Sequence, residues 1–289
     1  MTNLTLGRTD RYRPRKKRHF KVHPLIWIAM WGYAAISAVP LLIMFLNSFR
    51  SSAELIANPW PFTTSPTIEN YVNAWTQASF ATYVGNSVIV TVGAVVLSTA
   101  VSLPAAYALS RWQFVGNRLL QALFISGLMV PMMLAILPIF YLMDSLNLID
   151  SPLSLILIYG ANGVPFSIFV LSAFFRQLPV ELEEAASIDG SGYFRTFLQV
   201  MLPLVWPAVA TVAVFRFVPI WNEFLMPLVL LRSRENYTIS VGLTTFFSEY
   251  ETDRASLFAG LVIATIPLLI LFILATKQIV QGLTAGLGK

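Results

Sequence analysis

The chain has 289 residues, of which 56% are hydrophobic and only 11% are charged, whereas about a quarter of the residues in a soluble globular domain are charged. This composition excludes an ordinary soluble domain and predicts an all-α membrane protein whose solvent is the lipid bilayer. The net charge of +5 does not indicate nucleic acid as a partner, because the basic residues precede an apolar segment without interleaved aromatic residues, and the absence of cysteine excludes disulfides and thiolate metal sites.

Six apolar segments are long enough to cross a hydrocarbon core as helices, since about 20 residues suffice. They follow a basic tail, residues 1–24, and we expect the first segment to be retained because its apolar run is longer than that of a cleavable signal peptide. The sequence therefore predicts a six-helix transmembrane domain over residues 25–276 and a C-terminal tail over 277–289. The six predicted spans are residues 25–46, 83–109, 119–142, 153–174, 204–231 and 256–276.

Lysine and arginine predict the orientation, because short loops and flanks rich in these residues stay in the cytoplasm. Fourteen of the nineteen Lys and Arg residues fall on the side that the two termini share, and four fall on the other side; Arg216 lies within a predicted span. We therefore expect a multi-pass protein of the cytoplasmic (inner) membrane with both termini in the cytoplasm. The basic tail is sufficient both as an orientation signal and as an anchor to anionic membrane lipids.

Two outside connections, residues 47–82 and 232–255, are candidate surfaces for a partner. The first is interrupted by several prolines, and its Trp60 and Trp75 can lie at the membrane interface. Each connection is either a packed extracytoplasmic loop or a contact for a solute-binding protein, and the residues leave both alternatives open.

The connection between the fourth and fifth predicted spans, residues 175–203, has the features of a helix, a bend and a second helix. Pro179 and the acidic residues after it suit a helix N-terminus, because proline fits the first turn and carboxylates stabilise the positive end of the helix dipole. Gly190 suits the left-handed position that ends a helix, and a second helix can begin at Tyr193 at a new angle. Small side chains on the first helix would let another protein approach closely; an ordinary amphipathic surface helix is the alternative.

The fifth predicted span is costly in lipid, because it holds both Arg216 and Glu223. These two residues are about two helical turns apart and share one face of a regular helix, although a proline between them makes the alignment uncertain. The face, with Asn222, either lines a translocation path or holds the subunit to a partner. Trp221 can stack on a sugar ring, but packing is the commoner role of a tryptophan inside a membrane.

The chain lacks the motifs with which it could supply its own energy. The terminal Gly288 and Lys289 lack the upstream glycine and the following Ser or Thr of a nucleotide-binding loop. His19 and His23 lie in the basic tail, and no cluster of His and carboxylates predicts a catalytic or metal site. No cofactor is therefore expected on this chain, and ATP hydrolysis, where transport needs it, is expected on another chain.

Residues 184–203 match a known pattern at every spacing. Glu184, Ala185 and Ala186 are followed after three residues by Gly190, and after nine more by an aliphatic residue, any residue, and Leu202 with Pro203. This segment resembles the cytoplasmic loop of permease subunits of ATP-binding-cassette (ABC) importers, with valine at 200 where isoleucine is more usual. Residues 221–224, 237–243 and 282–286 resemble the carbohydrate-uptake branch of these permeases, above all the G-type subunit of maltose transporters and its glycerol-phosphate relatives.

The resemblance implies the type I ABC importer permease fold and a cytoplasmic coupling loop within residues 175–203. In that family the loop docks against an ATPase, which assigns this role to Glu184, Ala185, Ala186, Asp189, Gly190, Leu202 and Pro203. The candidate path residues are Arg216, Trp221, Asn222 and Glu223. The glycine-rich tail resembles a terminus that reaches toward the ATPase, which makes Gly282 and Gly286 candidate contacts.

The implied partners are a second, F-type permease, two copies of an ABC ATPase that binds ATP and magnesium, and an extracytoplasmic sugar-binding protein. The implied substrate is a sugar, in particular a di- or oligosaccharide. A glycerol-phosphate importer is the alternative within the family, and a secondary transporter or channel that needs no ATP is the alternative outside it.

Overall fold

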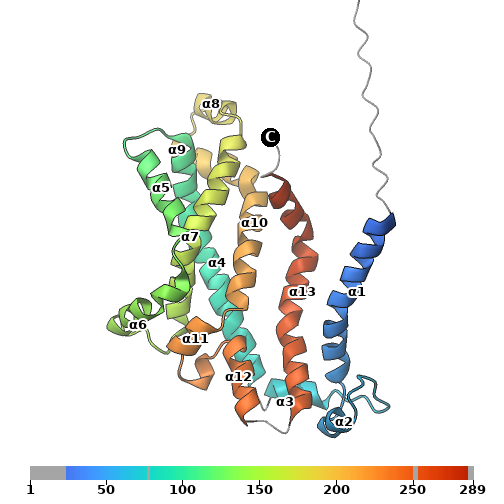
Figure 1. Ribbon diagram of the computed structural model, residues 1–289. Coiled ribbons are helices and arrows are strands. Elements are labelled where there is room, and N and C mark those ends of the chain that lie inside the picture. Colours follow the sequence, from blue (N-terminus) through green and yellow to red (C-terminus); the bar gives the residue numbers. More distant parts are fainter. Residues whose placement is uncertain (1–23, 77–78, 250–252, 286–289) are drawn as a thin grey trace, which may run out of the picture. The chain divides into compact units, whose positions relative to one another are not determined.

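The computed structural model describes residues 24–76, 79–249 and 253–285, and within these ranges every regular element is helical (Figure 1). The chain divides into two compact units, residues 1–43 and 44–289. The first unit holds most of α1 (Pro24–Asn47). The longer elements of the second unit are α4 (Phe80–Arg111), α5 (Asn117–Gly127), α6 (Ile136–Ser145), α7 (Pro152–Gln177), α10 (Leu202–Trp221), α12 (Ile239–Glu249) and α13 (Arg254–Ala285). The shorter ones are α2 (Ser52–Ala57), α3 (Glu69–Thr76), η1 (Met132–Ala135), α8 (Glu181–Ile188), α9 (Tyr193–Thr196), η2 (Phe197–Met201), α11 (Leu225–Leu230) and η3 (Arg234–Asn236).

Five helical segments in the described residues are long and apolar enough to cross a membrane, namely α1, α4, α7, the run Tyr193–Trp221 and α13 as far as Thr276. A sixth crossing exists if α5 and Met132–Ser145 count as one span, and the prediction of six spans is confirmed in that form. The proline at 131 suggested a kink or a helix end within the third predicted span, 119–142, and the two halves of this span meet at 87°. The break lies at Pro131, which lacks an N–H group and disfavours a helical conformation in the residue before it.

The fifth span differs from its prediction at both ends. It begins at Tyr193 rather than at 204, because α9, η2 and α10 form one continuous helix, and it ends at Trp221 rather than at 231. Between α9 and α10 the turn widens, and the Leu202 amide donates to the Phe197 carbonyl five residues earlier. A widened turn is a known response to a proline, since the ring of Pro203 would otherwise meet the carbonyl four residues before it.

The sixth predicted span, 256–276, agrees with the apolar part of α13, Arg254–Thr276. The same helix continues beyond that span to Ala285 and includes Gly282. The candidate contact Gly286 and most of the predicted basic tail, residues 1–23, lie outside the described residues.

The closest helix pair in the second unit is α4 with α7, and small residues make its approach possible. A Cβ atom added to Gly160 would lie 2.6 Å from the Leu97 side chain, and one added to Gly163 would lie 2.7 Å from the Ser98 side chain. In lipid, helices associate through this kind of close packing rather than through the hydrophobic effect. The α4–α7 pair is therefore the fixed frame around which the other helices of this unit are arranged.

The connection over residues 47–82 is more ordered than its prolines suggested. It contains α2 and α3, and α3 packs against α4 and α13. Arg50 is 1% exposed and donates hydrogen bonds to the Asn47 side chain and to the carbonyls of Glu54 and Asn58. This part supports the packed-loop alternative, whereas Trp60 is 69% exposed and leaves the partner-contact alternative open.

One aspartate joins two loops at the end of the unit opposite α8 (Figure 1). The Asp150 carboxylate accepts hydrogen bonds from the backbone amides of Arg232 and Ser233, at 2.8 and 2.9 Å, and from the side chains of Ser233 and Asn236. The Asp150 amide donates to the Leu230 carbonyl at 2.8 Å. Burial alone would raise the pKa of Asp150, but these hydrogen bonds to the charged form outweigh it and hold the pKa well below its usual value.

We expect Asp150→Ala to destabilise the protein by about 2 kcal/mol or more, because hydrogen bonds to a charged group contribute about 1.5–3 kcal/mol each and alanine also disfavours the left-handed backbone at this position, φ 58°. The carboxylate's contribution is present above pH about 4, the unfolded pKa, and is lost as pH falls through the lower folded pKa. Thermal melting of the purified protein at pH 7 measures the effect. Asp144→Ala is the control, because that exposed carboxylate joins no other loop; equal melting temperatures for the two variants would contradict the assignment.

Candidate functional site

The segment 175–203, which we call the EAA loop, is built around a helix that ends at a glycine. The Ser191 amide donates to the Ala186 carbonyl at 2.9 Å and the Gly190 amide to the Ser187 carbonyl at 3.0 Å. These two bonds and the φ of 77° at Gly190 form a Schellman motif, in which a left-handed residue satisfies the last carbonyls of a helix. The prediction that Gly190 ends this helix is confirmed, and the chain then turns into α9.

The outer surface of the EAA loop is unusually apolar for an exposed loop. Ile188, Tyr193 and Phe194 are 87%, 77% and 74% exposed. Large apolar side chains that gather on an exposed loop are typical of an interaction site. The predicted docking residues Glu184, Ala185, Asp189 and Gly190 are also exposed, Pro203 is exposed on the helix that follows, Leu202 is half-buried, and Ala186 is buried.

The inner side of α8 is held to the end of α4 by an ion pair. The Arg111 Nε atom lies 2.9 Å from Glu183 Oε1, and the two side chains are 7% and 21% exposed. The atoms do not meet hydrogen-bond geometry, so the contact is electrostatic. Arg111 also donates from Nη2 to the Leu178 carbonyl at 2.8 Å, and Trp112 packs edge-on against Tyr193. These contacts join the EAA loop to the end of α4.

We expect Arg111→Glu to lower transport activity strongly, because it places two carboxylates together at a largely buried position, where breaking an ion pair costs about 3–5 kcal/mol. The double reversal Arg111→Glu with Glu183→Arg should recover part of the activity, since it restores the pair but not the bond to Leu178. Glu181→Arg controls for the changed charge at the helix N-terminus, because Glu181 is exposed on the same turn. A double reversal no more active than Arg111→Glu alone would exclude the pair as the cause.

A second polar group of residues lies within the helices, where α7 meets α10. Arg216 donates from Nη2 to the Tyr159 carbonyl and to the Asn162 side chain, both at 3.2 Å, and the Tyr159 hydroxyl donates to Glu223 Oε2 at 3.0 Å. We call these four residues the Arg216 cluster. Arg216 and Glu223 form no direct ion pair among the described contacts; Tyr159 lies between them.

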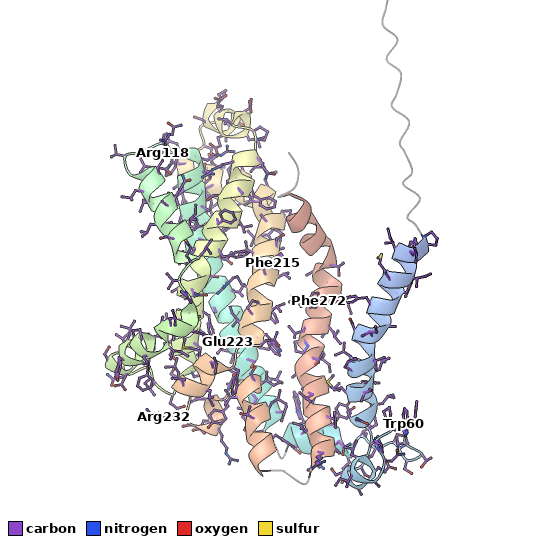
Figure 2. The ribbon with its side chains drawn as sticks, in the orientation of Figure 1. Trp60, Arg118, Phe215, Glu223, Arg232 and Phe272 are labelled. Carbon is purple, nitrogen blue, oxygen red and sulfur yellow. The ribbon has the colours of Figure 1, made fainter. Side chains whose placement is uncertain are left out.

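Glu223 also explains why the fifth span stops where it does. Its Oε1 atom accepts hydrogen bonds from the amides of Phe224 and Leu225, at 3.0 and 2.9 Å, which are the first donors of α11. A carboxylate at this position satisfies free amides and stabilises the positive end of the helix dipole. Glu223 therefore lies halfway down the bundle as a cap between two helices, as Figure 2 shows.

The guanidinium of Arg216 borders open space. A cavity of about 370 Å³ is lined by Arg216 and Asn162, by the rings of Phe166 and Phe215, and by residues 127–132 at the bend of the third span. Arg216 Nε is buried without a hydrogen-bond partner. A guanidinium beside a partly open, polar cavity can bind an oxygen of a ligand, and residues at the bend of the third span form one wall of this cavity.

The remaining candidate path residues are placed differently. Trp221 is 3% exposed, stacks on Phe217 with ring centroids 5.6 Å apart, and donates from its indole to the Ala264 carbonyl at 3.1 Å. Trp221 therefore packs α10 onto α13, and the structure does not support the hypothesis that its ring stacks on a sugar. Asn222 is exposed and donates to the Val218 carbonyl at 2.9 Å, four residues before it.

Sequence reasoning missed Tyr159 and the partner of Arg111. Tyr159 and Asn162 are three residues apart in an apolar span and therefore share a helix face, which is a usable sign of an internal polar site. Arg111 and Glu183 are far apart along the chain, and no local pattern joins them. Within the described residues, no group of three or more His, Cys, Asp or Glu is arranged to hold a metal ion.

Comparison with known proteins places this geometry in a family. The family described as "Binding-protein-dependent transport system inner membrane component" matches residues 98–285. The diacetylchitobiose uptake system permease protein NgcG of Streptomyces coelicolor is 37% identical, over 90% of this chain and 86% of the relative. The arabinooligosaccharides transport system permease protein AraQ of Halalkalibacterium halodurans is 36% identical, over 92% and 98%. The maltodextrin transport system permease protein MalD of Streptococcus pneumoniae is 30% identical, over 91% and 94%.

A solved structure has the same fold. One chain of a bacterial ABC transporter involved in the import of the acidic polysaccharide alginate aligns with a TM-score of 0.78 and 23% identity, over 92% of this chain and 99% of that chain. A second structure, of a bacterial alginate ABC transporter in complex with an alginate pentasaccharide-bound periplasmic protein, aligns with a TM-score of 0.60. The predicted type I permease fold is confirmed.

Proposed function

Since the chain belongs to the family of binding-protein-dependent transport system inner membrane components, we propose that it is the permease subunit of an ATP-driven importer for a di- or oligosaccharide. The single observation that carries this proposal is the EAA loop: an exposed helix that ends at Gly190, followed by one continuous helix that leads to the Arg216 cluster. An ordinary amphipathic surface helix does not account for the exposed Ile188, Tyr193 and Phe194 beside a continuous helix that leads to an internal polar site.

The mechanism follows from that connection. An ATPase that closes around α8 would move a body held at two points, by the Arg111–Glu183 pair to α4 and by the helix Tyr193–Trp221 to the membrane interior. A rigid helix transmits a displacement along its whole length, so movement at Gly190 would tilt the end that carries Arg216 and Glu223. The cavity beside Arg216 would then open toward one side of the membrane or the other.

The substrate class is proposed from the relatives and from the chemistry of the cavity. The named relatives take up diacetylchitobiose, arabinooligosaccharides and maltodextrins. A guanidinium, an amide and two aromatic rings, those of Arg216, Asn162, Phe166 and Phe215, suit the hydroxyl groups and apolar faces of a sugar.

The proposed assembly places the α8 end in the cytoplasm, because the cationic residues Arg111, Arg118, Arg176 and Arg195 gather there. A second permease, two copies of an ATPase that holds ATP and magnesium, and an extracytoplasmic sugar-binding protein would complete it. The other end of the unit, with Trp60 and Arg232, would face the binding protein. Both termini would lie in the cytoplasm.

ATP hydrolysis by the purified complex in lipid tests the function. We expect hydrolysis to rise several-fold when a binding protein loaded with an oligosaccharide is added, and to stay low with the unloaded protein. If only a binding protein loaded with glycerol phosphate stimulated hydrolysis, the transported substrate would be glycerol phosphate instead of a sugar. Transport without any copurifying ATPase would overturn the proposal in favour of a secondary transporter or channel.

A further inference from the structure

Two adjoining cavities at the α8 end differ sharply in character. One is a shallow groove of about 110 Å³ between α5 and α7, lined mainly by Phe124, Ile125, Pro165, Ile168, Phe169 and Ala173. The other is a cavity of about 660 Å³ beneath the α4–α5 connection, whose lining is mixed and includes polar side chains and two arginines, Arg118 and Arg176. Gln121 and Arg176 line both, so the apolar groove opens directly into the cationic cavity.

The charge of the polar cavity is unbalanced. No Asp or Glu is among its lining residues, and neither Arg118 nor Arg176 forms an ion pair within the described residues. Arg176 is held in place, because its Nη2 atom donates to Gln121 Oε1 at 2.7 Å while Gln121 donates to the Leu109 carbonyl at 3.0 Å. Two guanidiniums that line one cavity without a carboxylate suit the binding of an anion.

The position of the cavities indicates which anion. They lie where α4 and α7 end and α5 begins, as the label of Arg118 at the α8 end of Figure 2 shows, so the groove runs toward the hydrocarbon core and the arginines lie at the level of lipid headgroups. Basic cavities between membrane helices bind phosphate headgroups, and Phe169 and Ile125 in the groove are 55% and 50% exposed.

We propose that the α5–α7 groove and the adjoining cavity bind one anionic phospholipid, with its phosphate between Arg118 and Arg176 and an acyl chain along Phe124 and Phe169. The apolar groove matches the acyl chain of a phospholipid, and the adjoining cationic cavity matches its headgroup. A free sugar or a soluble phosphate ester has no group that fills the groove. This site is separate from the Arg216 cluster, and its existence does not depend on the transported substrate.

Photocrosslinking in lipid nanodiscs tests this proposal. The complete transporter is placed in discs with equal amounts of phosphatidylglycerol and phosphatidylcholine, one of which carries a photoreactive acyl chain, and crosslinked peptides are mapped by mass spectrometry. We expect peptides of α5 and α7 to react preferentially with phosphatidylglycerol. The double variant Arg118→Gln with Arg176→Gln should reduce that preference by about 30-fold, since each arginine near a membrane surface contributes about five-fold.

Two further variants separate the alternatives. Ala173→Trp fills the groove and keeps both charges, so it should abolish crosslinking by both lipids at these peptides. Arg232→Gln removes an exposed arginine at the opposite end and should leave the preference unchanged. Displacement of phosphatidylglycerol by excess inorganic phosphate would overturn the proposal in favour of a phosphate site. Absence of lipid crosslinks at α5 and α7 in the assembled wild type would mean that another subunit covers the groove, and would overturn it equally.

Discussion

Gly190→Asp is expected to reduce sugar uptake at least about ten-fold while the permease still inserts and assembles in the membrane. Gly190 is exposed on the docking side of the EAA loop, and a Cβ atom built on it meets nothing within 4 Å in this chain. The added carboxylate would therefore project toward the ATPase, where a single unfavourable contact of about 1.4 kcal/mol changes an equilibrium ten-fold. Uptake in vesicles and recovery of the ATPase with the purified permease measure the two parts of the prediction.

Two substitutions at Gly190 separate backbone strain from charge. The φ of 77° costs an alanine about 1–2 kcal/mol, whereas asparagine and aspartate tolerate this conformation better. Gly190→Ala should therefore loosen the end of α8 and reduce uptake a few-fold, and Gly190→Asn should stay closer to the wild type than Gly190→Asp does.

Gly192→Asp is the matched control. Gly192 is equally exposed and also has no neighbour within 4 Å of a built Cβ, but its φ is −77° and it is the N-cap of α9, where aspartate is favoured. It places the same charge two residues away without strain. Normal uptake and normal ATPase recovery for Gly190→Asp would remove the docking role from this loop.

The sequence predicted those parts of the fold that depend on local chemistry. The apolar segments predicted the six spans, because few structures other than a membrane span need so long an apolar run. Gly190 predicted the end of α8, because few residues other than glycine adopt the left-handed conformation at a helix terminus. The positions of α4 and α7 agree with the predicted second and fourth spans to within a few residues.

The errors concern residues whose role depends on distant partners. The fifth span was extended to 231 because its apolar residues continue past Trp221, and nothing local shows that Glu223 turns back onto the amides of Phe224 and Leu225. The continuity of α9 with α10 was likewise hidden, because a proline such as Pro203 favours a helix start or a break when only its own propensity is considered. Tyr159 was overlooked, because its role depends on hydrogen bonds to Arg216 and Glu223, which are distant in the sequence.

These errors have one consequence for the mechanism. A bend before Pro203 would have separated the docking helix from the membrane interior, and the observed continuous helix joins them. The lower end of that helix is then fixed by Glu223 through α11, which in turn reaches Asp150 by way of Leu230. A displacement at Gly190 would therefore reach an end that Glu223 joins to α11, and Arg216 lies on the helix between these two points.

Arg216→Gln is expected to reduce sugar uptake at least about ten-fold without lowering the melting temperature of the purified protein. Arg216 makes only two hydrogen bonds, both at 3.2 Å, and its Nε atom is buried without a partner, so the protein gains little stability from it. An arginine within a membrane span is costly, and the few hydrogen bonds of Arg216 do not offset that cost, which indicates a functional role rather than packing. Loss of one charge-assisted hydrogen bond to a sugar costs about 1.5–3 kcal/mol, or about ten-fold or more in transport.

Glu223→Ala should behave in the opposite way, lowering the melting temperature first, because it uncaps α11 and leaves the Tyr159 hydroxyl without an acceptor. A double-mutant cycle of Tyr159→Phe with Glu223→Ala isolates the bond between them, for which we expect a coupling of about 1 kcal/mol, within the range measured between membrane helices. Arg216 and Glu223, which are seven positions apart on one predicted helix face, thus have different roles. Arg216 is a cation that faces the ligand, and Glu223 is a structural cap. If Arg216→Gln instead destabilised the protein as much as Glu223→Ala and left the uptake of the remaining folded protein normal, Arg216 would belong to the packing, and the cavity beside it would lose its place on the sugar's path.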